Sequence, residues 1–184
     1  NLTKANDDII IANIEYAAEP AIKSEILAYA HTFRALSLGT LATFWEQAPI
    51  AVGKNASFSS RNDVLKEAIK SLETAASTIA TTPPSATFNS SVVGSVNISN
   101  TIQALLARYN MMLGNYEAAI TAANKVSETV KSGFNFDDVS PNPMFFNTFG
   151  NRNVTEPKAN FGLPAALAPA TTADGRNSFY YSAG

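Results

Sequence analysis

The fold of this chain is decided by the stretch LARYNMMLGNYEAAI, residues 106–120. Apolar residues at helical spacing on both sides of a Gly-Asn pair predict one helix over 102–113 and an antiparallel partner over 116–130. Gly114 suits the left-handed conformation that ends many helices and that a residue with a Cβ resists. The stretch therefore predicts a helical hairpin with a tight turn.

Three segments upstream of the hairpin also carry a helical period. They cover residues 7–18, 21–45 and 62–80, and in each the apolar residues recur at intervals of three and four. Pro20 can begin the second helix from its first turn, and Pro49 closes the segment that follows it. Together with the hairpin, these segments predict an all-α fold.

Polar residues at the predicted helix ends indicate how the helices begin. Asp7 and Asp8 stand at the start of the first helix, where they suit the positive end of its dipole. Ser60, three residues before Asp63, resembles a capping box, and Asn100 can cap the helix that starts at residue 102. The first helix is expected to bury Ile10, Ile11, Ile14 and Ala18. The second is expected to bury Ile22, Ile26, Tyr29, Phe33, Leu36, Leu41 and Phe44.

Two parts of the chain lack a helical period. Residues 82–101 are rich in Ser, Thr, Asn, Pro and Gly and predict a loop, with room for a short strand around 92–96. After Gly133 the chain is rich in Pro, Gly, Asn and aromatics. We expect a single domain over 1–184, with a helical scaffold over 1–133 and an irregular, ligand-facing segment over 134–184.

The hairpin resembles a tetratricopeptide helix–turn–helix unit. In that unit small residues stand where helices cross, an aromatic fills the gap and glycine occupies the turn. The matching positions are Ala107, Tyr109, Gly114, Tyr116 and Ala119. Both tyrosines are therefore expected in the hairpin core.

The order of the segments is similar to that of the SusD/RagB family of nutrient-capture lipoproteins. Residues 30–36 (AHTFRAL) are similar to the family's arginine-alanine-leucine helix, and 44–50 (FWEQAPI) to its aromatic–proline exit. Residues 62–75 resemble the next helix, and the hairpin over 104–126 follows in the family's order. The segments that stand where the family has ligand-facing insertions are 156–162 and 174–176.

This resemblance implies a helical scaffold at the cell surface, on the bacterial outer membrane. The scaffold would lie over a TonB-dependent transporter and hold a glycan or peptide nutrient for import. Family members are anchored by a lipidated N-terminal Cys. This chain has no cysteine, so contact with the membrane is implied only through an anchor that these residues lack. Family members are usually more than twice as long, so we expect a fragment or a short relative.

Composition narrows the classes of partner. The net charge is −2, only 15% of residues are charged, and lysines and arginines stand singly. Phosphate neutralisation requires clustered cations, so we expect no nucleic-acid partner. Without cysteine there is no thiolate metal site or thiol nucleophile. A surface rich in amides and hydroxyls suits neutral, polyhydroxylated ligands, and it is also common in secreted bacterial proteins.

The sequence gives little support to catalysis. His31 is the only histidine and no Gly-x-Ser-x-Gly elbow accompanies it, so we expect a structural role. The adjacent pairs Asp7-Asp8 and Asp137-Asp138 are expected to cap helices or turns rather than to form an acid–base dyad. Arg34 is expected to be buried or half-buried and to bridge a helix to a loop. We expect no enzyme activity, no cofactor and no metal site.

Aromatic side chains are the candidate ligand-binding residues. Trp45 falls at a helix end beside a loop, where it can offer a stacking face to a sugar ring or act as a core plug between helices. Tyr180 and Tyr181, with Phe179 and Asn177, form a second aromatic–polar cluster. Phe145, Phe146 and Phe149 are expected to pack in a core. The function predicted is glycan capture for import, and the alternative is a tetratricopeptide-like scaffold that binds peptides.

Overall fold

The computed structural model describes residues 1–89, 95–137, 139 and 141–142. The chain divides into two compact units, Asn1–Asn135 and Phe136–Gly184. Every helix and strand of the described residues lies in the first unit. The short strand expected around 92–96 falls mostly outside the described residues.

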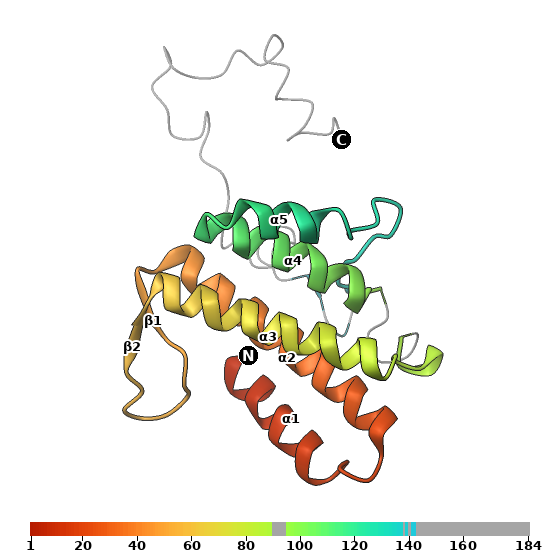
Figure 1. The fold of residues 1–184 in the computed structure, drawn as a ribbon. Helices are drawn as coiled ribbons and strands as arrows, with labels where there is room; N and C mark the ends of the chain where they lie inside the picture. The colour runs from red at the N-terminus through yellow and green to blue at the C-terminus, as the bar shows by residue number, and fades with distance from the viewer. Residues whose placement is uncertain (90–94, 138, 140, 143–184) are drawn as a thin grey trace. The chain divides into compact units, whose positions relative to one another are not determined.

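The described part of the first unit holds five helices and one two-stranded ribbon, so the predicted all-α class is confirmed (Figure 1). The helices are α1 (Leu2–Ile14), α2 (Pro20–Phe44), α3 (Arg61–Thr81), α4 (Ile98–Leu113) and α5 (Tyr116–Ala123). Strands β1 (Gln47–Pro49) and β2 (Phe58–Ser60) pair antiparallel and join α2 to α3.

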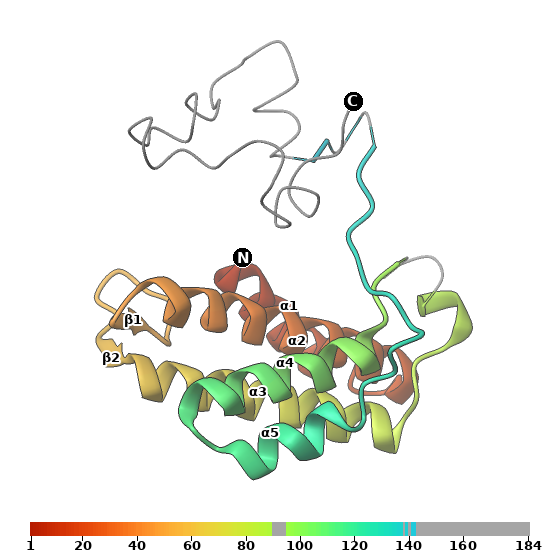
Figure 2. The ribbon, with the colours of Figure 1, turned by 90° about the horizontal axis from the view of Figure 1, so that it is seen from above.

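The helices of this unit pack largely in chain order. α2 and α3 lie side by side at its centre, α1 packs on α2, and α4 packs on α3 and also touches α2 (Figures 1 and 2). α5 covers one side of α4. The core lies between α2, α3 and α4. Its largest fully buried apolar side chains are Leu38, Val64, Leu65, Leu72 and Ile102.

Three predicted helix ends are confirmed. Pro20 is the first residue of α2. The Ser60 hydroxyl accepts a hydrogen bond from the Asp63 amide at 3.2 Å and donates one to the Asp63 carboxylate at 2.7 Å, which caps α3. Gly114 ends α4 with φ +80°, the left-handed conformation that glycine adopts without strain. The chain can therefore turn back at once into α5.

The prediction for the first helix was wrong at its start and about its buried face. α1 begins at Leu2, so Asp8 lies inside the helix, where it pairs with Lys4 one turn away. Its buried residues are Ala5 and Ala12. The isoleucines expected inside, Ile10, Ile11 and Ile14, are exposed. Small alanines let α1 approach α2 closely, and α1 has no second helix on its other side among the described residues.

The hairpin also differs from the prediction at both outer ends. α4 begins four residues early, at Ile98, because the Asn97 side chain caps it by accepting from the Asn100 amide. α5 ends at Ala123 instead of continuing to residue 130. The Asn100 side chain holds the following segment: its oxygen accepts from the Ser127 amide at 2.7 Å, and its nitrogen donates to the carbonyls of Ser127 and Val130. Asn100 therefore anchors a loop and is not a cap.

Only one of the two hairpin tyrosines lies in the core. Tyr109 is 2% exposed and packs over Gly39 of α2. Tyr116 is 67% exposed, against the expectation that it is buried. It lines the groove on the outer side of the α4–α5 hairpin, where no other helix of the described residues covers it. The tetratricopeptide-like pattern thus identified the hairpin but not which tyrosine faces the core.

Arg34 joins three helices rather than a helix and a loop. From α2 it donates to the Asn6 side chain of α1 at 2.9 Å and to the Glu67 carboxylate of α3 at 2.9 Å, and also to the Ser71 hydroxyl. The side chain is 13% exposed, which confirms the expectation of a buried or half-buried arginine. A planar guanidinium can reach several partners at once. Arg34 therefore fixes the positions of α1 and α3 on α2.

His31 lies one turn before Arg34 and should make the unit less stable in mild acid. Its pKa lies below the usual value, chiefly because burial disfavours the cation; nearby Arg34 lowers it further, while Glu67 opposes the shift. At pH values between the pKa of His31 in the folded chain and its pKa in the unfolded chain, the unfolded chain binds more protons than the folded one. The free energy of unfolding should therefore fall as the pH drops below about 6.5, the usual histidine pKa.

Chemical denaturation near neutral pH and at about pH 5 measures this effect. The His31→Gln variant is the control because it does not titrate in this range. The unsubstituted chain should lose more stability than the variant when the pH is lowered from neutral to about 5. Equal losses in both proteins would show that His31 does not contribute.

Candidate functional site

The end of α2 places Trp45 at the surface. Its amide still bonds the Leu41 carbonyl at 2.9 Å, but its backbone is extended, with φ −128° and ψ 143°. The chain then enters β1, and an ion pair between Glu46 and Arg61 at 2.9 Å holds the ribbon against the start of α3. Trp45 is 54% exposed. The alternative of a core plug between helices is therefore wrong.

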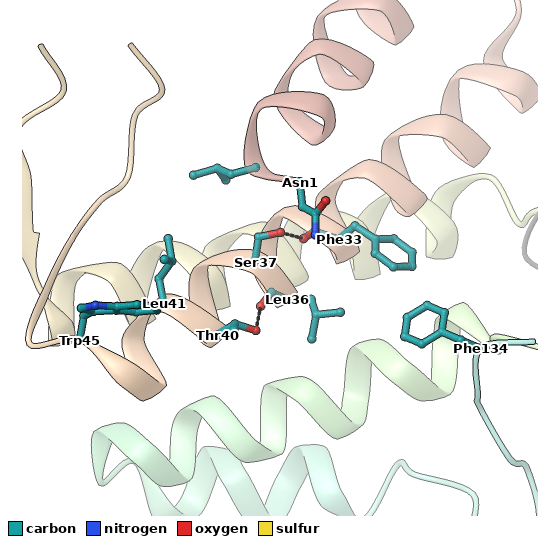
Figure 3. Close-up of a pocket in the computed structure, with 9 residues that line it drawn as sticks. Asn1, Phe33, Leu36, Ser37, Thr40, Leu41, Trp45 and Phe134 are labelled. Carbon is teal, nitrogen blue, oxygen red and sulfur yellow. Dashed lines mark hydrogen bonds between the residues drawn. The ribbon is translucent and has the colours of Figure 1, made fainter. Parts of the chain in front are cut away.

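Trp45 lines a pocket of about 680 Å³ (Figure 3). Most of its wall comes from α2, and the rest comes from the start of α1 and from the segment after α5. The lining residues are Asn1, Leu2, Phe33, Leu36, Ser37, Thr40, Leu41, Trp45 and Phe134. All of them belong to the first unit.

A single stripe of α2 forms the floor of the pocket. Its residues follow the intervals of three and four that place side chains on one helix face: Phe33, Leu36, Ser37, Thr40 and Leu41. A different stripe, which includes Ala28, Ala35, Leu38 and Ala42, is buried in the core with α3. α2 thus has two apolar faces. Because α1 covers only part of the outer one, the remainder is left open as the pocket.

Aromatic rings stand at both ends of the pocket. Figure 3 shows Trp45 at one end, with Phe33 and Phe134 at the other. The ring centroids of Phe33 and Phe134 are 6.1 Å apart, and the rings are tilted by 48°. Phe44 meets the Trp45 ring edge-on at 5.8 Å but does not line the pocket. It is exposed, although the spacing predicted that it is buried.

Hydroxyl groups lie between the aromatic ends. Ser37 donates to the Phe33 carbonyl at 2.9 Å, and Thr40 donates to the Leu36 carbonyl at 2.8 Å (Figure 3). Each hydroxyl oxygen keeps lone pairs that can accept from a ligand. None of the nine lining residues has an ionisable side chain. The pocket therefore offers stacking faces and neutral hydrogen-bond acceptors, and it has no side chain suited to general acid–base catalysis.

The structure places one of the four predicted site residues at this pocket. Asn177, Tyr180 and Tyr181 lie outside the described residues, as do Phe145, Phe146 and Phe149. Of the paired aspartates near residue 137, Asp137 accepts from the Val139 amide at 2.9 Å, as in a turn.

Sequence reasoning missed eight of the nine residues of the pocket, among them Phe33, Ser37, Thr40 and Phe134. The spacing of Phe33, Ser37, Thr40 and Leu41 was a signal for a second face on α2. Its polar hydroxyls marked that face as partly open. No signal in the sequence connects Phe134 to α2, because at least ninety positions separate Phe134 from that helix along the chain.

Neither the described residues nor the known proteins assign this chain to a class. No helix in the described residues is long and apolar enough to cross a membrane. Within those same residues, no group of three or more His, Asp or Glu side chains is placed to hold a metal ion. Comparison with protein-family models, with curated proteins and with solved structures finds no match to this chain. The similarity to the SusD/RagB family therefore rests on the sequence motifs alone.

Proposed function

We propose that this chain is a binding protein that holds a neutral glycan in the Trp45 pocket without chemical turnover. The observation that carries the proposal is a half-exposed tryptophan at one end of a pocket whose lining side chains are all uncharged. Sugar rings present apolar C–H faces that stack on an indole, and their hydroxyls donate to oxygens such as those of Ser37 and Thr40. A charged ligand would find no ion-pair partner among these side chains.

The SusD/RagB-like order of segments gives this binding a biological setting. In that setting the chain captures a nutrient at the cell surface and passes it to a TonB-dependent transporter in the outer membrane. The motifs that support this part are AHTFRAL at 30–36 and FWEQAPI at 44–50. The second of these contains Trp45, so one residue of a stretch that suggests the family also lines the pocket.

Calorimetric titration with a panel of neutral polysaccharides and oligosaccharides tests the proposal. We expect saturable binding without product formation. Trp45→Ala should weaken it tenfold or more, about 1.4 kcal/mol, because truncation removes the stacking face. Phe58→Ala is the matched control: Phe58 is an exposed aromatic on β2 that does not line the pocket. Binding that is unchanged in Trp45→Ala would place the ligand elsewhere, and the absence of binding to every glycan would contradict the proposal.

One observation favours a peptide-binding scaffold as the second candidate. A pocket of about 450 Å³ lies between α3, α4 and the segment after α5, and amide and hydroxyl side chains line much of it. Such groups can bond a peptide backbone. However, the Asn97 oxygen already accepts from the Asn100 amide, and Asn100 already holds residues 127–130. Ser99, Gln103 and Lys125 remain for a ligand, so this candidate ranks second.

A further inference from the structure

The outer side of the α4–α5 hairpin carries apolar side chains that no other helix of the described residues covers. Met111, Tyr116 and Ile120 are 57%, 67% and 61% exposed. They line a groove of about 390 Å³ between the two helices. Figures 1 and 2 show that the hairpin lies at the edge of the helical unit. Large apolar side chains that are exposed together in one groove indicate an interaction surface, whereas hydrophobic residues scattered singly over a surface do not. We propose that this α4–α5 face docks against the same face of a second copy of the chain.

The shape of the face is complementary to itself. Three alanines, Ala107, Ala119 and Ala123, form the low part of the groove, and the three large side chains rise around them. A twofold interface places the same patch on both partners, so that patch must supply both the protruding groups and the spaces they fill. The α4–α5 face has both, as do the helix surfaces that pack in bundles.

The direction of the two helices also permits a twofold contact. α4 and α5 run antiparallel because only Gly114 and Asn115 separate them. A twofold axis parallel to the helices lays α4 of one copy over α5 of the other. Every neighbouring pair is then antiparallel, as in an up-and-down four-helix bundle. The hairpin thus supplies half of a bundle.

The charges at the groove are self-complementary as well. Arg108 lines the groove, and Glu117 follows the groove residue Tyr116 in the first turn of α5; neither forms an ion pair within the described residues. Arg108 is five residues before the end of α4, and Glu117 is one residue after the start of α5. Their heights along the helix axis differ by about 6 Å, at a rise of 1.5 Å per residue. An arginine side chain covers this span, so Arg108 of each copy meets Glu117 of the other.

Sedimentation analysis of the purified chain over a range of concentrations tests the proposal. The mass should rise from 19.5 kDa towards that of two chains as concentration increases. Ile120→Glu should weaken association tenfold or more, because it places two carboxylates in the apolar contact. Ile14→Glu is the matched control, since Ile14 is 71% exposed on α1 and far from the α4–α5 face in sequence; it should leave association unchanged.

A charge exchange gives a second test that does not depend on the Ile120 variant folding. Arg108→Glu alone should weaken association, and adding Glu117→Arg should restore it, with helical circular dichroism confirming the fold of each variant. A chain that stays monomeric at all concentrations would overturn the proposal and leave the groove to a helix from another protein. Dimers that are indifferent to both Ile120→Glu and Arg108→Glu would also overturn it. The glycan titration uses a different face, so either proposal can fail alone.

Discussion

Replacing Gly39 with alanine is expected to lower the free energy of unfolding by about 2 kcal/mol. A Cβ at this position would lie less than 3.0 Å from the phenol ring of Tyr109, closer than real Cβ contacts come. Because Tyr109 is 2% exposed, its ring has no open space to move into. Overpacking of this kind costs about 1–3 kcal/mol, while alanine gains about 1 kcal/mol over glycine inside a helix. We expect the cost of the steric overlap to lie near the top of its range and to exceed the gain in helix propensity.

Chemical denaturation followed by circular dichroism measures this change. Gly53→Ala is the matched control, since nothing lies within 4 Å of a Cβ at Gly53; it should be close to neutral. In a Tyr109→Leu background, Gly39→Ala should be neutral or stabilising, because the ring that it strikes is gone. An equal loss in both backgrounds would contradict the explanation.

Replacing Leu72 with alanine is expected to destabilise the helical unit by about 2–5 kcal/mol. Leu72 is fully buried on α3, in the cluster that joins α2, α3 and α4. Truncation removes apolar contacts on all sides and leaves a cavity that rigid helices fill only in part. Natural domains have only about 5–15 kcal/mol of stability, so this variant loses a large share of it.

Thermal and chemical unfolding of Leu72→Ala should agree on the size of the loss. Leu72→Met nearly preserves the side-chain volume and should cost less than about 1.5 kcal/mol. Ile14→Ala removes an exposed side chain and should change stability by less than about 0.5 kcal/mol. If Leu72→Ala were as mild as Ile14→Ala, the core would not be centred between α2 and α3.

The two faces of α2 explain why a mutation can change ligand binding without changing folding stability. Leu38 and Ala42 pack in the core, whereas Ser37 and Leu41 beside them line the Trp45 pocket. Trp45 leaves the helix at its last turn and is half exposed. We therefore expect Trp45→Ala to change ligand binding with little effect on folding, in contrast to Gly39→Ala and Leu72→Ala.

The sequence predicted the local features of this protein well. The hydrophobic period and the helix-breaking proline and glycine residues predicted five helices. Gly114 and Ser60 predicted how two of the helix ends are formed. These features depend on residues within one or two turns of each other. Whether a carbonyl finds a cap, or whether a turn needs a left-handed residue, is settled by neighbours along the chain.

Only the tertiary structure decided which apolar faces are buried. Ile14 of α1 and Tyr116 of α5 fit a buried stripe by spacing, yet both are exposed, because each helix has a partner on one side only among the described residues. The pocket likewise requires Phe134 to meet Phe33 across the fold. The spacing of hydrophobic residues indicates which face of a helix can be buried. Whether that face is buried depends on a second element that packs against it, and that element is distant in the sequence.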